Sequence, residues 1–225
     1  MRTTIVIPAK GTSERVASKN LYNLNGKSLV FRACEKALKC KLVDTVFLDT
    51  ESDEIKKNVL SLQEYGLQII DRPEYLANNN TDGNELVAFE KDYVKDCDLF
   101  LHTYSTSPLL TYKTIDKCIE KFQKEYENYD SFFTARPIRE YIWSDEGPVN
   151  FDLKDLPNSK DLNGYYKETH GLYGIKMDVL QKINRRLGEK VLPIEISEKE
   201  SLDIDYYTDI EYLEYLKSRE RGCNK

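Results

Sequence analysis

Residues 5–21, IVIPAKGTSERVASKNL, are the stretch around which the rest of the chain is arranged. They begin as a short apolar run, which predicts a buried strand. The run breaks at Pro8 and Gly11 into a segment crowded with hydroxyl and cationic side chains. Backbone N–H groups and hydroxyls donate to phosphate oxygens, and Lys and Arg neutralise phosphate charge. The stretch therefore predicts a loop that holds a polyphosphate, with an ordinary solvated loop as the alternative.

The remaining chain alternates apolar, β-branched runs with amphipathic ones. Further strands are predicted at residues 43–50, 67–73, 97–103, 129–137, 168–176 and 191–197. Helices are predicted at residues 29–43, 53–65, 85–94, 112–126, 177–183 and 209–217. This alternation indicates an α/β fold with a mostly parallel sheet and helices on both faces. Ligands on such sheets bind at the carboxyl ends of the strands, where the loop after Pro8 would lie.

Length and charge narrow the class of protein. A chain of 225 residues suits one domain, residues 1–225, with room for a small insertion. A formal net charge of −6 argues against nucleic acid or a membrane surface as a partner, and favours a small anionic ligand for the cationic loop. No apolar run approaches the roughly 20 residues of a membrane span. The scattered cysteines predict reduced thiols in a cytoplasmic protein: Cys34, Cys40, Cys97, Cys118 and Cys223.

Residues 139–168 interrupt the regular alternation. Short Gly-Pro and Pro-Asn-Ser turns separate segments that carry Tyr141, Trp143, Phe151, Tyr165 and Tyr166. Such aromatic content is too high for a solvated linker. We expect an excursion from the sheet that packs on another surface.

A pair of acids, Asp203 and Asp205, follows the last predicted strand. In an extended backbone, residues two apart point the same way. Two carboxylates on one face beside a phosphate loop would suit Mg²⁺. The alternative is a pair of acids placed at the start of the last helix, where acids are common.

Two other groups of side chains have structural interpretations. His102 and His170 each stand alone among apolar residues, and both are interpreted as structural. The tyrosines within residues 206–215 are predicted to form one packed face of the last helix.

The sequence motif of the first loop supports a more specific interpretation. IPAKGTSERVASKN, followed by Gly26-Lys27-Ser28-Leu29, resembles the amino-terminal motif IPARxGSxxxxxKN and GKPL turn of the acylneuraminate cytidylyltransferase family. Lys10 stands in place of the family's usual Arg. STSPLLT at residues 105–111 resembles QPTSPLR, with Tyr104-Ser105 in place of Gln-Pro. Residues 71–85 resemble the RPxxLAxDxAS segment, and residues 201–205 the S-x-DID motif.

The resemblance implies a Rossmann-like, mostly parallel mixed sheet, and a dimerisation insertion at residues 139–168 in a homodimer. It implies that CTP is bound by Lys10, Gly11, Ser13, Arg15, Lys19, Asn20, Arg72, Asn80 and Asp82. Catalysis would rest on Lys19, with Lys10 and Asp203. Asp203 and Asp205 would hold Mg²⁺. The acceptor would contact Tyr104, Ser105, Thr106, Ser107, Lys160 and Tyr173.

The implied reaction transfers CMP from CTP to an acidic sugar, or to a related acidic or phosphorylated acceptor, and releases pyrophosphate for surface-glycan biosynthesis. Tyr104-Ser105 and Lys160 depart from the family pattern on the acceptor side, so an acceptor other than ordinary sialic acid is predicted. Two alternatives stay open at this point. One is a glycosyltransferase that uses a nucleotide sugar, although its D-x-D pair would lie mid-chain. The other is a nucleotide-binding relative that has lost turnover.

Overall fold

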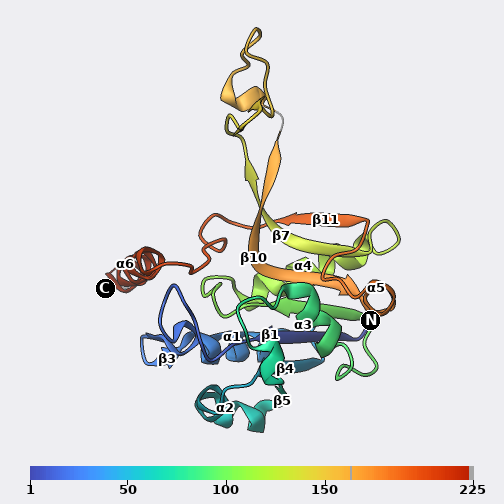
Figure 1. The fold of residues 1–225 in the computed structure, drawn as a ribbon, viewed down its shortest axis with the longest axis vertical. Coiled ribbons are helices and arrows are strands. Elements are labelled where there is room, and N and C mark those ends of the chain that lie inside the picture. The colour runs from blue at the N-terminus through green and yellow to red at the C-terminus, as the bar shows by residue number, and fades with distance from the viewer. Residues whose placement is uncertain (163, 223–225) are drawn as a thin grey trace.

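The computed structural model describes residues 1–162 and 164–222. A seven-stranded sheet with the order β11-β7-β10-β6-β1-β4-β5 forms its centre (Figure 1). β10 runs antiparallel to both of its neighbours, and the other pairs are parallel. The strands are β1 (Thr3–Pro8), β4 (Thr45–Thr50), β5 (Leu67–Asp71), β6 (Leu99–Thr103), β7 (Ser131–Ile138), β10 (Tyr165–Lys176) and β11 (Val191–Glu195). The predicted mostly parallel mixed sheet is confirmed.

Helices cover both faces of the sheet, as predicted. Ile5 and Ile7 of β1 belong to one apolar cluster, whereas Val6 between them belongs to a cluster on the other face. The first cluster includes residues of α1 (Leu29–Leu38), α2 (Asp53–Val59) and α4 (Tyr112–Lys124). The second includes residues of α3 (Gly83–Glu90) and α5 (Met177–Ile183). A third cluster joins α6 (Tyr207–Gly222) to the first loop through Ile210, Leu213 and Val16.

Local chemistry explains most helix boundaries. The Ser28, Ser52 and Thr111 hydroxyls each accept a backbone N–H at the start of α1, α2 and α4. The predicted helix over residues 53–65 divides, because α2 continues as a 3₁₀ helix, η2 (Leu60–Tyr65). Gly66 ends η2 with φ 97°, as a C-terminal glycine should. The other 3₁₀ helices are η1 (Lys19–Leu21), η3 (Glu74–Leu76) and η4 (Ser159–Asp161).

A small hairpin of β2 (Asn23–Leu24) and β3 (Lys27–Ser28) was not predicted. Asn25 and Gly26 connect the strands with φ of 54° and 85°. Positive φ at both central residues is the geometry that Asn-Gly favours in a two-residue hairpin turn. The hairpin leads directly into α1 and so closes the first loop.

An arm, residues 139–162, projects from the sheet beyond β7 and β10 (Figure 1). It contains a second hairpin of β8 (Trp143–Ser144) and β9 (Gly147–Pro148). The Phe151 ring packs between the rings of Tyr141 and Trp143, at centroid distances of 5.0 and 5.3 Å. Trp143 is still 58% exposed. The predicted excursion from the sheet is therefore present, whereas its role in a dimer stays a prediction.

Cys34, Cys40, Cys97 and Cys118 carry free thiols, as predicted, and Cys223 lies outside the described residues. Within the described part of the chain, no helix combines the length and the apolar character needed to cross a membrane.

Candidate active site

A cavity of about 310 Å³, here called the loop cavity, opens where β1 ends and the first loop begins. It unites cationic and hydroxyl side chains of that loop with the loops after η3 and β6. Its lining includes Lys10, Ser13, Arg15, Lys19, Asn20, Asn78, Asn79, Thr81, Tyr104, Ser105 and Thr106. The structure thus brings together most of the residues predicted to hold the triphosphate, at the sheet edge where ligands bind.

Hydrogen bonds hold the first loop in shape. The Asn20 side-chain amide donates to the Lys10 carbonyl at 2.6 Å, and the Ser105 hydroxyl donates to Asn20 Oδ1. Lys19 Nζ donates to the Ile204 carbonyl at 2.7 Å and lies 3.6 Å from Asp205 Oδ1. The Lys19 side chain is only 13% exposed. Its ammonium is therefore held in place before any ligand binds.

Gly11 serves packing in this structure. Its N–H donates to Glu51 Oε1 at 2.7 Å, so that donor is already used. A Cβ at this position would come within 2.8 Å of Ser52 Cβ, closer than real Cβ contacts. Only glycine allows the loop to pass so close to the start of α2.

Three residues expected to bind the nucleotide have other surroundings. The Arg72 side chain is 3% exposed and pairs with Asp49, with Nε 2.9 Å from Oδ2, so it does not face the loop cavity. Asp82 caps α3 by accepting the N–H groups of two helix residues. Asn80 does not line the cavity. Its neighbours Asn78, Asn79 and Thr81 do, and Asn79 accepts a hydrogen bond from the Lys10 ammonium.

A second cavity of about 480 Å³, here called the carboxylate cavity, lies between the bend of β10 and the start of α6. Acids and bases are mixed along it. Its lining includes Arg136, Lys167, Glu168, Thr169, His170, Glu198, Ser201, Leu202, Asp203, Asp205, Tyr206, Asp209 and Tyr212. Sequence reasoning had assigned only Asp203 and Asp205 of these to the site.

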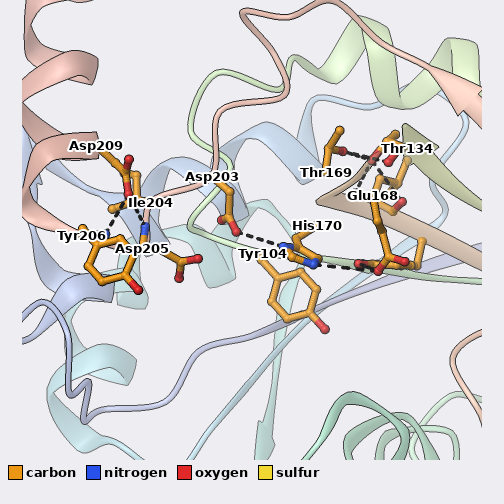
Figure 2. Close-up of polar contacts among 12 residues, drawn as sticks. Tyr104, Thr134, Glu168, Thr169, His170, Asp203, Ile204, Asp205, Tyr206 and Asp209 are labelled. Atoms are coloured by element: carbon orange, nitrogen blue, oxygen red, sulfur yellow. Dashed lines mark hydrogen bonds and ion pairs between the residues drawn. The ribbon is translucent and has the colours of Figure 1, made fainter. Parts of the chain in front are cut away.

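Asp205 connects the two cavities. Its Oδ1 lies 2.9 Å from Arg15 Nη2 of the first loop and also faces Lys19. The Ile204 N–H donates to the Thr106 carbonyl at 2.9 Å, which fixes the segment between the two acids. Figure 2 shows both acids with His170 and Glu168. The predicted D-x-D pair therefore lines a single cavity at the edge of the cationic loop.

The two acids fit a divalent cation. Asp203 Oδ1 is buried and has no hydrogen-bond partner within the described residues. Hard carboxylate oxygens of this kind suit Mg²⁺, which is often bound by one or two carboxylates together with substrate phosphates. In residues 1–162 and 164–222, no three His, Cys, Asp or Glu side chains form a metal-binding group. The metal itself remains a prediction.

The two histidines have different surroundings. His102 is buried beside Glu90 and Tyr104, and burial lowers the pKa of its imidazole to about 3, which agrees with a structural role. His170 contradicts that expectation, because its side chain is 54% exposed. Its Nδ1 lies 3.1 Å from Asp203 Oδ2, and this hydrogen bond raises the pKa of His170. The strand containing it bends into the cavity, which sequence spacing does not reveal.

The expected packing of the last tyrosines is wrong. The exposed faces of α6 and of the turn before it carry Tyr206, Tyr207, Tyr212 and Tyr215. The buried face of α6 carries Ile210 and Leu213 instead, because helical spacing places them on the side that faces the first loop.

Only some of the residues expected to contact the acceptor line a cavity. Tyr104, Ser105 and Thr106 line the loop cavity, and the Tyr104 hydroxyl already contacts Arg186. Ser107 and Tyr173 are buried, so they are excluded from direct contact in this conformation. Lys160 lies in the arm and lines neither cavity of its own chain. Sequence reasoning missed Glu168, because only the register shift of β10 between Glu168 and Tyr173 brings it to the carboxylate cavity.

Comparison with known proteins agrees with this geometry. Residues 4–220 match the family described as cytidylyltransferase. The chain is 28% identical to a Helicobacter pylori protein named pseudaminic acid cytidylyltransferase and UDP-2,4-diacetamido-2,4,6-trideoxy-beta-L-altropyranose hydrolase, over 92% of this chain and 41% of that protein. It is also 28% identical to a 3-deoxy-manno-octulosonate cytidylyltransferase from Chlorobaculum tepidum, over 80% of this chain and 76% of that protein. The chain thus spans less than half of the Helicobacter relative.

A solved structure shows the same fold. It is described as CMP:2-keto-3-deoxy-manno-octonic acid synthetase complexed with CTP. It superposes with a TM-score of 0.72 at 16% identity, and the match covers 98% of this chain and 100% of that one. The match over residues 4–220 shows that the chain belongs to the cytidylyltransferase family.

Proposed function

We propose that this protein transfers CMP from CTP to an acidic sugar or a related acidic or phosphorylated acceptor, releases pyrophosphate, and so forms an activated sugar for surface-glycan biosynthesis. The observation that carries the proposal is the junction of the two cavities at Asp205. There, cations of a phosphate-binding type of loop meet the carboxylate pair, with Arg15 2.9 Å from Asp205. The names of the relatives support CTP and a sugar acid as the substrates.

The chain's own residues have roles that follow from charge and position. An acceptor oxygen attacks the α-phosphorus of CTP, and pyrophosphate departs. Lys10, Arg15 and Lys19 hold the phosphates and offset the negative charge that develops as the bond to pyrophosphate breaks. Lys19 is the main stabilising cation, because two contacts already fix its ammonium at the junction. Positioning of two charged substrates accounts for the remaining rate enhancement.

Asp203 and Asp205 would hold the magnesium ion. When bound, Mg²⁺ supplies a positive charge that polarises phosphate oxygens and can activate an attacking oxygen. The observation that favours such a role is that Asp203 Oδ1 is buried without a hydrogen-bond partner among the residues that the structure describes. His170 holds the other oxygen of Asp203 at 3.1 Å and so keeps the carboxylate oriented toward the cavity.

We infer a homodimer in which the arm packs on the partner molecule. Exposed apolar side chains along the arm support this inference, among them Trp143, Leu153 and Leu156. Burial against a second copy would remove these surfaces from water. The free thiols agree with a reducing, cytoplasmic compartment. Light scattering on the purified chain tests the assembly, and a stable monomer would contradict it.

The activity is tested by a pyrophosphate-release screen. The four ribonucleoside triphosphates are crossed with pseudaminic acid, N-acetylneuraminic acid, 3-deoxy-manno-octulosonate and its 8-amino analogue, with and without Mg²⁺. Sugar phosphates and phosphonates complete the panel. We expect pyrophosphate from CTP with at least one sugar acid. Tight CTP binding without turnover across the panel would instead support a relative that has lost activity.

A further inference from the structure

The bend that aims β10 into the carboxylate cavity is a bulge between Glu168 and Tyr173, where the pairing with β7 changes register. Buried threonine hydroxyls satisfy the backbone there. Thr103 Oγ1 donates to the Gly171 carbonyl at 2.6 Å, and Thr134 Oγ1 accepts the Leu172 N–H at 3.0 Å. Bulges redirect side chains and are common beside active sites. The bulge is therefore a built feature of the site.

The bulge forces an unusual backbone on His170, whose φ is 55°. A histidine in the left-handed region is uncommon and persists where its surroundings fix it. Thr169 Oγ1 anchors the bulge by donating to the Thr134 carbonyl at 2.9 Å. As a result, Glu168 and His170 both line the carboxylate cavity (Figure 2).

The Glu168 carboxylate accepts hydrogen bonds through one oxygen, and its other oxygen accepts none within the described residues. Its Oε1 accepts hydrogen bonds from the buried Tyr173 hydroxyl and from Arg186 Nη2, the latter at 3.2 Å. Within residues 1–162 and 164–222, no hydrogen bond involves Oε2. The side chain is 34% exposed and lines the cavity. The carboxylate is thus fixed in position with a free acceptor atom.

Arg186 fixes that carboxylate from outside every recognised motif. Its guanidinium lies 3.7 Å from the centroid of the Tyr173 ring, and Nη1 donates to the Tyr104 hydroxyl at 3.1 Å. A Cβ on Gly83 would come within 3.0 Å of Nη1, so the backbone at Gly83 also confines the Arg186 guanidinium. A planar guanidinium can stack and donate in two directions at once, which an ammonium cannot do. Arg186 thereby joins Glu168 of one cavity to Tyr104 of the other.

We propose that Glu168 determines which acceptor is used and that Arg186 is the residue that positions it. The inference rests on the proposed cytidylyltransferase activity. Oε2 selects an acceptor that brings an N–H or O–H donor to this point. The acceptor's own acid group turns away from Glu168, toward the cations Arg136 and Lys167 of the same cavity. A site built around a fixed polar group rejects analogues that leave the group unpaired.

The chain offers matched variants for the test. Glu168→Gln keeps the shape and removes the charge, and Arg186→Met removes the guanidinium. Beside Arg186 in the sequence, Arg185 forms an exposed ion pair with Glu189. Arg185→Met and Glu189→Gln are therefore controls of identical chemistry that lie outside both cavities.

The experiment measures pyrophosphate release with the acceptor that the wild type uses best, and with its analogue that lacks one N–H or O–H donor. Glu168→Gln should lower kcat/KM for the full acceptor by about 10- to 100-fold, the scale of a hydrogen bond to a charged group. The KM for CTP should stay unchanged. The analogue should lose far less, so the preference between the two acceptors shrinks.

Arg186 is tested by coupling. Arg186→Met should produce the same split between acceptor and CTP, and Arg186→Lys should not restore it. The double variant Arg186→Met with Glu168→Gln should lose no more kcat/KM for the acceptor than Glu168→Gln alone, because both changes disrupt the same Glu168–Arg186 pair. Additive losses, or a loss that falls equally on CTP, would overturn the positioning role.

The outcomes separate the two levels of proposal. Unchanged kcat/KM and unchanged acceptor preference in Glu168→Gln would overturn this inference and leave the proposed activity intact. A wild type that releases no pyrophosphate with any acceptor would remove the proposed activity, and the Glu168 inference would fall with it.

Discussion

The loop cavity and the carboxylate cavity differ in how they are built. The loop cavity takes most of its charge from one continuous segment, with Lys10, Arg15 and Lys19 along a single loop. The carboxylate cavity is assembled from β7, β10 and the segment before α6, and it mixes acids with bases. A triphosphate carries a concentrated charge that cations can meet from several directions. A sugar has directional donors and acceptors, so we expect a cavity that selects a sugar to hold its side chains on a rigid strand.

The largest effect is expected at the carboxylate pair. Asp203→Asn or Asp205→Asn should abolish metal-dependent turnover while the fold and most CTP affinity remain, because a hard anionic ligand is lost without loss of volume. Pyrophosphate release across a Mg²⁺ titration measures turnover, and calorimetry measures CTP binding. The exposed Asp178→Asn in α5 serves as the control. If both variants stay active at ordinary Mg²⁺, the pair is only a helix-start feature.

The next largest effect is expected at Lys19 in the loop cavity. Lys19→Ala should lower kcat by at least ~10²-fold, on the scale of removing one charged transition-state donor. The lost hydrogen bond to the Ile204 carbonyl should also lower the free energy of unfolding by about 1 kcal/mol. Initial rates and urea unfolding measure the two quantities. The exposed Lys182→Ala is the control.

Near-normal turnover in Lys19→Ala would show that another cation of the loop cavity stabilises the transition state. Lys10 would then be the next candidate, because it lines the same cavity.

A smaller effect concerns the acceptor. We expect N-acetylneuraminic acid to be a poor substrate, because Tyr104 and Ser105 replace the amide and proline of the related motif and the Tyr104 hydroxyl is already bonded to Arg186. Steady-state kinetics at saturating CTP measure this. A kcat/KM of about 10⁴ M⁻¹s⁻¹ or more, ordinary for a physiological substrate, would refute the expectation.

The smallest predicted effect is on stability, at the buried carboxylates Glu90 and Asp49. Burial raises the pKa of Glu90 and of Asp49 to about 7, against roughly 4 in an unfolded chain. The folded state therefore holds extra protons, and this stabilisation, complete below the unfolded pKa, is lost as the pH rises through about 7. The free energy of unfolding should fall between about pH 5 and pH 7.

Glu90→Gln removes one of these titrating groups. It should flatten the pH dependence by up to about 1.4 kcal/mol per pH unit, the value for one proton. Urea unfolding at several pH values measures the slope. An unchanged slope would show that Glu90 is not the group that takes up the proton.

Much of the fold was readable from the sequence, because strands such as TVFLDT and helices such as residues 112–124 carry their periodicity locally. The loop cavity was readable for the same reason, since its cations lie in one segment. Arg72 was misplaced because its partner Asp49 is 23 residues away, and a buried ion pair leaves no local pattern. Glu168 and His170 were missed because only the bulge of β10 aims them into the cavity. Arg186 was missed because it lies outside every recognised motif.

We propose that the two cavities bind CTP and an acidic acceptor side by side. The most direct measurement is ³¹P NMR of the wild-type protein with CTP, Mg²⁺ and the sugar acid selected by the screen. We expect the three CTP resonances to give way to one phosphodiester resonance and one of pyrophosphate, with the two products in equal molar amounts. CTP that stays intact, or that yields free CMP without a phosphodiester, would contradict it.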